Sequence, residues 1–393
     1  MRFDVHLRKT VQRQLASVAQ SMADWDSHQS NVDIQERLTS AICPFSHTTL
    51  WAGHCGGVDG TGDFPAVSYA DSFVYVSVAA GALYRSDTVC GLKELDHEVG
   101  PLVEFTWLTS STQQRQSALL ASFEQLVGTS VDDVLQHSDY ADLGTSGVEK
   151  RRINSLIIPP AHDAGNLGIQ LRTTAELAAA LRLIESAPKG TLVLTDGTMS
   201  LPLAGRSKQS LFFEHLRRYC CVRARKRGVV FASLSKSSGL PTGIKIEDAA
   251  KAALGINEPE HWYVRVPTKQ LDDWSLFPDD GPQVPPTGAV SYLVRFHRKT
   301  PVMRLDLDQQ YWQSAIATGD VEKNEKELFA SLDYVSHDQR AYGYPYPIKA
   351  AHDRASLTEH ERTVLRQQLV ESAVQAGISR NAFRDPSQMT GHR

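Results

Sequence analysis

Apolar residues in this chain recur in two spacings, helical in some segments and strand-like in others. In residues 1–40, Val11, Leu15, Val18 and Met22 follow a helical spacing, which predicts a helix packed over the rest of the protein. Residues 66–84 are rich in valine, tyrosine and alanine and predict one or two strands, and residues 102–108 predict another. Strands this close in sequence favour antiparallel hairpins.

The second half of the chain alternates strands with helices. Residues 191–195 and 228–234 are short apolar runs typical of buried strands, and a helical pattern at 208–226 separates them. Further strands are expected in 151–160, 262–266, 289–296 and 302–307, a surface loop in 272–286, and helices in 111–126, 173–186 and 358–376. This mixture predicts an α/β fold with a mixed sheet flanked by helices and with peripheral helical and loop insertions. We expect the chain to divide into an N-terminal helical segment (1–40), a main domain (41–376) and a C-terminal tail (377–393).

Composition excludes several classes of protein and points to a location. The charged and apolar fractions, 22% and 41%, are those of a folded domain and exclude a disordered chain or a collagen. The polar start contains no secretory signal, and the longest apolar run, 73–84, is shorter than the roughly 20 residues of a membrane span. Because the five cysteines are sparse and odd in number, we expect a reducing compartment, the cytoplasm, and no membrane association.

The net charge of −4 argues against a non-specific nucleic-acid binder but leaves room for a local basic groove. One candidate is the segment 217–227, which contains no acidic residue. A solvated helix face is an equally good interpretation of this run. If it binds DNA, the contacts would come from Arg217, Arg218, Arg223, Arg225, Lys226 and Arg227.

Two acidic residues stand where an α/β sheet binds ligands. Asp59 lies in V-D-G-T after a glycine-rich run, and Asp196 lies in L-T-D-G-T at the end of an apolar run. Carboxylates at the ends of neighbouring buried strands point into the crevice at that edge of the sheet and could share Mg²⁺ or Mn²⁺ ions. The alternative is that each Asp-Gly pair only forms a turn.

Two further residues extend this candidate site. The strand–helix–strand unit over 191–236 would bring Lys236 to the same edge as Asp196 through a right-handed crossover, where a lysine can bind phosphate. His352 precedes the last helix and could ligate a metal or transfer protons. Taken alone, each is more often an ordinary surface or packed residue.

Four short motifs in order resemble the NurA nuclease family. They are V-D-G-T at 58–61, L-T-D-G-T at 194–198, V-F-A-S-L-S-K-S at 230–237 and G-Y-P-Y-P-I-K-A-A-H-D-R-A-S-L-T-E-H-E-R at 343–362. The resemblance implies an RNase H-like core and a homodimer that cuts DNA with Mn²⁺ or Mg²⁺. It also implies a HerA-type hexameric ATPase as partner in DNA end processing or repair.

The resemblance also implies roles for single residues. Asp59 and Asp196 correspond to metal-binding aspartates, His352 to a metal-site histidine and Lys236 to a catalytic lysine. The family has a glutamate on the helix before the second aspartate; Glu176 fits this position better than Glu185. The family's active-site tyrosine has no clear counterpart, and Tyr219 is a loose candidate.

Two other functions stay open at this point. An ATPase of the actin and sugar-kinase type would also use Asp-Gly-Thr loops, and ATP binding would favour it. A non-catalytic adaptor of a HerA-like motor is the third alternative, against which the intact aspartates argue. The spacing of Cys43, His47, His54 and Cys55 fits no established zinc motif, so buried thiols and loop histidines are the favoured interpretation.

Overall fold

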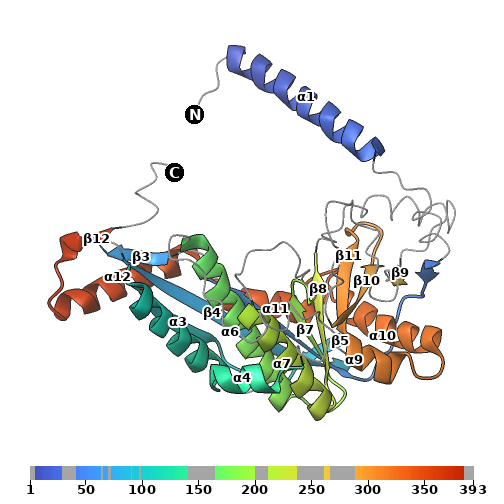
Figure 1. Ribbon diagram of the computed structural model, residues 1–393. Coiled ribbons are helices and arrows are strands. Elements are labelled where there is room, and N and C mark those ends of the chain that lie inside the picture. Colours follow the sequence, from blue (N-terminus) through green and yellow to red (C-terminus); the bar gives the residue numbers. More distant parts are fainter. Residues whose placement is uncertain are drawn as a thin grey trace, which may run out of the picture.

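A twelve-stranded mixed sheet organises the computed structural model (Figure 1). The structure describes residues 5–28, 41–62, 65–69, 72–89, 91–96, 99–139, 164–199, 211–236, 261–265 and 288–384. The predicted strand in 151–160 and the predicted loop in 272–286 lie outside these residues.

The strands follow the order β1-β9-β10-β11-β8-β7-β2-β4-β3-β12, and β5 and β6 pair with β4. The pairs β2–β7 and β7–β8 are parallel, and the other pairs are antiparallel. Their bounds are β1 (Cys43–Pro44), β2 (His54–Thr61), β3 (Pro65–Tyr69), β4 (Ser72–Asp87), β5 (Gly91–Glu94), β6 (Leu102–Leu108), β7 (Leu192–Asp196), β8 (Val230–Ser235), β9 (Trp262–Arg265), β10 (Ala289–Arg295), β11 (Met303–Asp308) and β12 (Phe383–Arg384).

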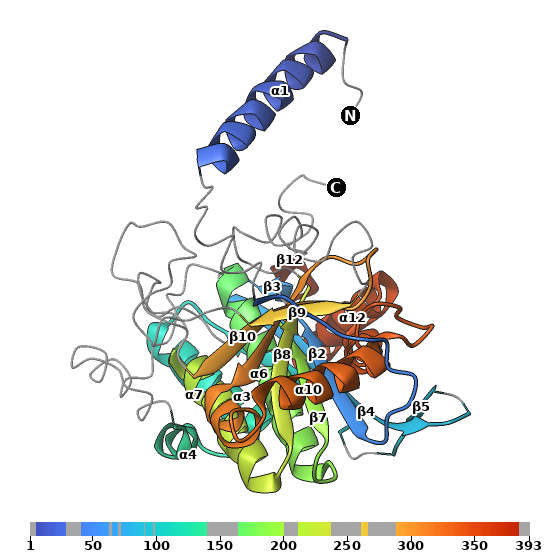
Figure 2. The same cartoon turned by 90° about the vertical axis from the view of Figure 1, so that its right-hand side faces the viewer.

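Helices flank this sheet, so the predicted α/β class with a mixed sheet is confirmed (Figures 1 and 2). The helices are α1 (Val5–His28), α3 (Thr112–Val127), α4 (Val131–His137), α6 (Ala164–Ser186), α7 (Leu211–Arg227), α9 (Gln309–Tyr311), the π-helix η2 (Trp312–Ile316), α10 (Val321–Ser336), α11 (Tyr346–Ala355), α12 (Glu359–Gln375) and the 3₁₀ turn η3 (Arg380–Ala382). A capping box formed by Thr358 and Glu361 begins α12, as the helix expected from residue 358 requires. No helix among the described residues is both long and apolar enough to cross a bilayer.

The glycine-rich run before Asp59 forms strand β2. A Cβ on Gly56 would lie 2.7 Å from Leu183 of α6, and a Cβ on Gly57 would lie 2.3 Å from the backbone of α11 at Pro347. Because side chains of successive residues point to opposite faces, the two glycines let a helix approach each face of the sheet.

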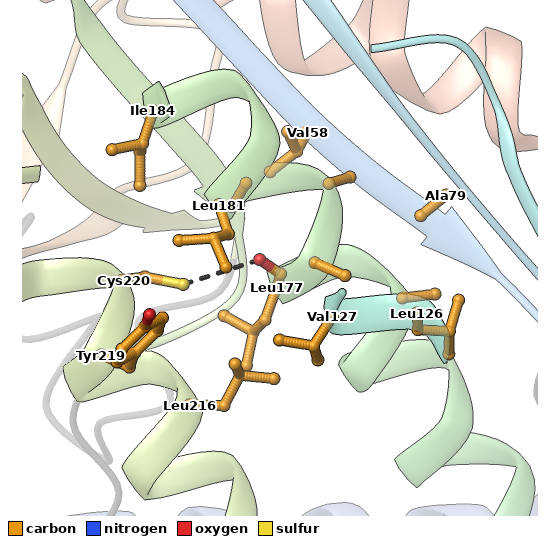
Figure 3. Packing of buried hydrophobic residues seen from close by; sticks show 14 of the residues in the cluster. Val58, Ala79, Leu126, Val127, Leu177, Leu181, Ile184, Leu216, Tyr219 and Cys220 are labelled. Atoms are coloured by element: carbon orange, nitrogen blue, oxygen red, sulfur yellow. Dashed lines mark hydrogen bonds between the residues drawn. The ribbon is translucent and has the colours of Figure 1, made fainter. Parts of the chain in front are cut away.

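Two apolar clusters fill the space between the sheet and its helices. One lies against α3, α4, α6 and α7, and Figure 3 shows Leu177, Leu181 and Leu216 meeting in it. The other lies on the far side and includes Leu328 of α10 and Ile348 of α11. Both clusters reach β2 or its neighbours, so the central strands are fixed from both faces.

Both terminal segments depart from the expectations. Val11, Leu15, Val18 and Met22 of α1 are all exposed, so the prediction that this helix packs over the rest is wrong. Figure 1 shows α1 standing away from the sheet. In the segment expected as a tail, Phe383–Arg384 forms β12 and pairs with β3.

Candidate functional site

The two aspartates stand at the same level on adjacent parallel strands. The register pairs Val58 of β2 with Thr195 of β7, and Asp59 and Asp196 are the next residue on each strand. Asp59 is buried. Burial raises the pKa of Asp196, and the charge of Asp59 adds to this effect while Lys236 opposes it. A carboxylate whose pKa is raised by burial and by a neighbouring carboxylate belongs to a site that favours a bound cation.

His352 reaches this site from α11. Its Nδ1 lies 2.7 Å from Oδ2 of Asp59, and its Nε2 lies 3.2 Å from Oγ of Ser356. The segment that carries His352 is a helix on the face of β2 and β4. A helix is possible here because Gly57 has no side chain to hold α11 away.

Glu176 is the glutamate of α6 that reaches the end of β2, from the face of the sheet opposite α11. A Cβ on Gly60, the residue after Asp59, would lie 2.7 Å from Cγ of Glu176. Arg172 Nε lies 3.2 Å from Oε1 of Glu176. Glu185 stands near the other end of α6, where it pairs with Arg223. The absence of a side chain at Gly60 therefore admits Glu176 to the end of β2.

Lys236 lies just beyond β8, at the edge where β7 ends. Its Nζ is 3.5 Å from Oδ2 of Asp196 and 4.8 Å from the centre of the Tyr344 ring. More than half of the lysine side chain is exposed, at 57%. The amine can therefore reach a ligand placed next to Asp196.

Tyr344 is a site residue that the sequence analysis missed. Its hydroxyl is buried without a hydrogen-bond partner among the described residues. Burial raises the pKa of Tyr344, and the charges of Asp196 and Asp59 raise it further. The loose candidate Tyr219 instead donates to Asp133 at 3.2 Å, within the cluster under α7. The G-Y-P-Y-P segment eight residues before His352 was the available signal.

The basic segment 217–227 does not form the continuous exposed surface expected for DNA. Arg217 and Arg218 are buried. Arg218 and Arg225 both pair with Asp139 and Asp308, which fixes α7 to β11.

The end of the same helix is more open. Arg223 and Arg227 pair with Glu185, and Lys226 is exposed. Most arginines of this basic segment are therefore paired with acidic residues of other segments, which is consistent with the net charge of −4. Only the last turn of α7 offers cations to a partner.

These residues fit a divalent cation by their donor chemistry. Carboxylates from Asp59, Asp196 and Glu176 are ligands that Mg²⁺ and Mn²⁺ prefer, and the imidazole of His352 suits Mn²⁺ better than Mg²⁺. The buried hydroxyl of Tyr344 has no hydrogen-bond partner within the described part of the chain, which fits a site completed by a ligand.

Comparisons with known proteins complete the description. No family model and no curated protein matches the sequence. The chain is similar to solved structures of NurA nucleases. For the NurA nuclease from Sulfolobus solfataricus the identity is 13% and the TM-score 0.46, with 94% of this chain and 98% of that chain covered. For NurA bound to dAMP and manganese the identity is 12% and the TM-score 0.43, with 94% of this chain and 98% of that chain covered.

Proposed function

We propose that this protein is a metal-dependent nuclease that cleaves phosphodiester bonds of DNA. The contact between Asp59 and His352, 293 residues apart, beside Asp196 on the adjacent strand carries the proposal. A turn-forming Asp-Gly pair needs no imidazole at 2.7 Å and no second carboxylate at its level.

In this proposal Asp59, Asp196, Glu176 and His352 hold one or two Mn²⁺ or Mg²⁺ ions. The bound ion supplies Lewis acidity toward the scissile phosphate and toward water. The contact with Asp59 orients the imidazole of His352, as carboxylates commonly do at metal sites.

Two other side chains act on the substrate. Lys236 neutralises negative charge that develops on the phosphoryl oxygens, because its amine is exposed and lies next to Asp196. Tyr344 donates its unpartnered hydroxyl to a phosphate oxygen or a water in the site. Lys226 and Arg227, exposed in the last turn of α7, contribute contacts to the DNA backbone.

The proposal includes partners and location. The motifs that resemble NurA support a homodimer that works with a HerA-type hexameric ATPase in DNA end processing. The cytoplasmic location expected from the sparse cysteines belongs to the same proposal.

The test is cleavage of end-labelled single- and double-stranded DNA by the purified full-length chain with Mn²⁺, Mg²⁺ or EDTA. Asp196→Asn should lower cleavage by more than about 100-fold, the upper loss seen for residues that only support a ligand. Asp353→Asn, an exposed aspartate on α11, is the control and should keep full activity. If Asp196→Asn cuts DNA as fast as the control, or loses thermal stability with its specific activity intact, the turn interpretation holds instead.

A further inference from the structure

A second group of potential ligands lies at another part of the sheet. His47 follows β1, His261 immediately precedes β9, and Asp333 and His337 stand at the end of α10. One ligand atom from each residue lies within 4.8 Å of the others. Four strands separate β9 from β2, which carries Asp59. The group is therefore distinct from the proposed catalytic site.

Asp333 is the centre of this group. Its side chain is fully buried, and its Oδ2 accepts the Thr48 N–H at 2.7 Å and contacts His47 Nδ1 at 2.9 Å. Its Oδ1 lies 2.9 Å from Nδ1 of His261 and 3.2 Å from Nδ1 of His337. Three imidazoles thus converge on one carboxylate that has no access to solvent.

Hydrogen bonds account for the contacts at Oδ2 of Asp333 but not for those at Oδ1. Asp333 Oδ1 and His261 Nδ1 are close, yet neither atom has a hydrogen-bond partner among the residues described. Burying polar atoms without a hydrogen bond is unfavourable. A cation between them would satisfy a lone pair of each atom at the same time.

The distances suit a small transition-metal ion. With metal–ligand bonds of about 2.0–2.1 Å, neighbouring ligand atoms in a tetrahedral site are about 3.3 Å apart. Oδ1 of Asp333 lies 2.9 Å from His261 Nδ1 and 3.2 Å from His337 Nδ1, which is near this value. All four ligand atoms lie within 4.8 Å of one another, so the more distant pairs must move together by at most about 1.5 Å to reach the tetrahedral separation. Imidazole nitrogens favour Zn²⁺ and its neighbours over Mg²⁺ or Ca²⁺.

We propose that His47, His261, Asp333 and His337 bind a structural Zn²⁺ ion that fastens the β1–β9 edge of the sheet to α10. Of the residues first considered for zinc, only His47 takes part; Cys55 is fully buried in the apolar cluster with α11.

His337 Nδ1 also lies 2.8 Å from the carbonyl oxygen of Asp333, a contact that this nitrogen gives up when it ligates the ion.

At this position the ion would stabilise the edge of the sheet that β1 and β9 form. β1 consists of only two residues, and its pairing with β9 involves only Cys43 and Pro44. So short a pairing adds little stability. Ligands from three segments, separated by more than 200 and more than 70 residues, would close two long loops around this edge.

Zinc binding to the full-length chain tests the proposal. The Asp59→Asn/Asp196→Asn background weakens binding at the other site, and EDTA followed by dialysis removes bound metal. Zn²⁺ is then titrated in competition with a chromophoric chelator, and thermal unfolding is followed with and without Zn²⁺. His47→Gln is the main variant because its side chain is 44% exposed, so folding should tolerate the change. His137→Gln is the matched control, since His137 is an exposed histidine that contacts one aspartate, Asp133.

We expect one tightly bound Zn²⁺ per chain in the background and in the control. His47→Gln should weaken Zn²⁺ affinity at least about tenfold, as loss of a partner at a metal site does, and should abolish the rise in the unfolding temperature on adding Zn²⁺. His337→Gln should behave in the same way. Equal Zn²⁺ affinity in His47→Gln and His137→Gln, or no tight Zn²⁺ in the background, would overturn the proposal. DNA cleavage does not enter the readout, so this result is independent of the proposed nuclease activity.

Discussion

Replacing Gly57 by alanine should separate His352 from Asp59 without touching either residue. The new Cβ would lie 2.3 Å from Ile348 N and from Pro347 C, both backbone atoms of the α11 region. Real Cβ contacts begin near 3.0 Å and become ordinary at 3.4 Å, so α11 must move by 3.0 − 2.3 = 0.7 Å to 3.4 − 2.3 = 1.1 Å. Backbone cannot rotate away as a side-chain end can.

This displacement sets the size of both effects. Overpacking of this kind costs about 1–3 kcal/mol of the free energy of unfolding. A catalytic group misplaced by about 1 Å lowers turnover by up to about 100-fold. His352, carried by α11, would leave its 2.7 Å contact with Asp59. Activity should therefore fall much more than the amount of folded protein.

The control is the neighbouring residue on the same strand. A Cβ on Gly56 would meet Cδ2 of Leu183 at 2.7 Å, and this is the flexible end of a side chain on the opposite face. Gly56→Ala should lower stability toward the small end of the same range and keep its cleavage rate. The assay is Mn²⁺-dependent DNA cleavage per folded molecule, with folded protein measured by urea unfolding. Equal cleavage rates for Gly56→Ala and Gly57→Ala would show that contact between α11 and β2 does not position the site.

Three further predictions use single residues. His352→Ala should lower cleavage and reduce the preference for Mn²⁺ over Mg²⁺, measured as a ratio of rates, while the exposed His360→Ala should change neither. Tyr344→Phe should leave the unfolding temperature equal or higher, because it removes a buried hydroxyl that no described residue hydrogen-bonds, and it should lower turnover; unchanged turnover would exclude the hydroxyl from the reaction. For Asp139, burial alone would raise the pKa, but Arg218 outweighs it and holds the folded pKa below the usual value of about 3.9. The ionised Asp139 therefore contributes fully to the free energy of unfolding above about pH 4, and this contribution is lost as the pH falls through the lower folded pKa. In Asp139→Asn the free energy of unfolding, measured with urea, should fall less steeply between these pH values. An unchanged dependence on pH would contradict the pairing with Arg218.

The sequence by itself determined the elements and the sheet edge. The short apolar run that ends in Asp196 predicted a buried strand with its carboxylate at one end, and the structure has β7 there. The capping box at Thr358 fixed the start of α12, because both of its hydrogen bonds lie within four residues. Patterns of this kind depend on near neighbours and can be seen in one segment at a time.

Only the tertiary structure decided what these elements meet. The resemblance indicated His352, but its 2.7 Å contact with Asp59 spans 293 residues and depends on α11 fitting over Gly57. The sequence suggested Arg218 as a DNA contact, but in the structure it is buried and pairs with Asp139 and Asp308. These partners lie 79 and 90 residues away, and no local pattern predicts such a pair. The convergence of three histidines on Asp333 is of the same kind. Local spacing constrains the backbone, whereas the partner of a polar side chain is set by which distant segments the sheet brings together.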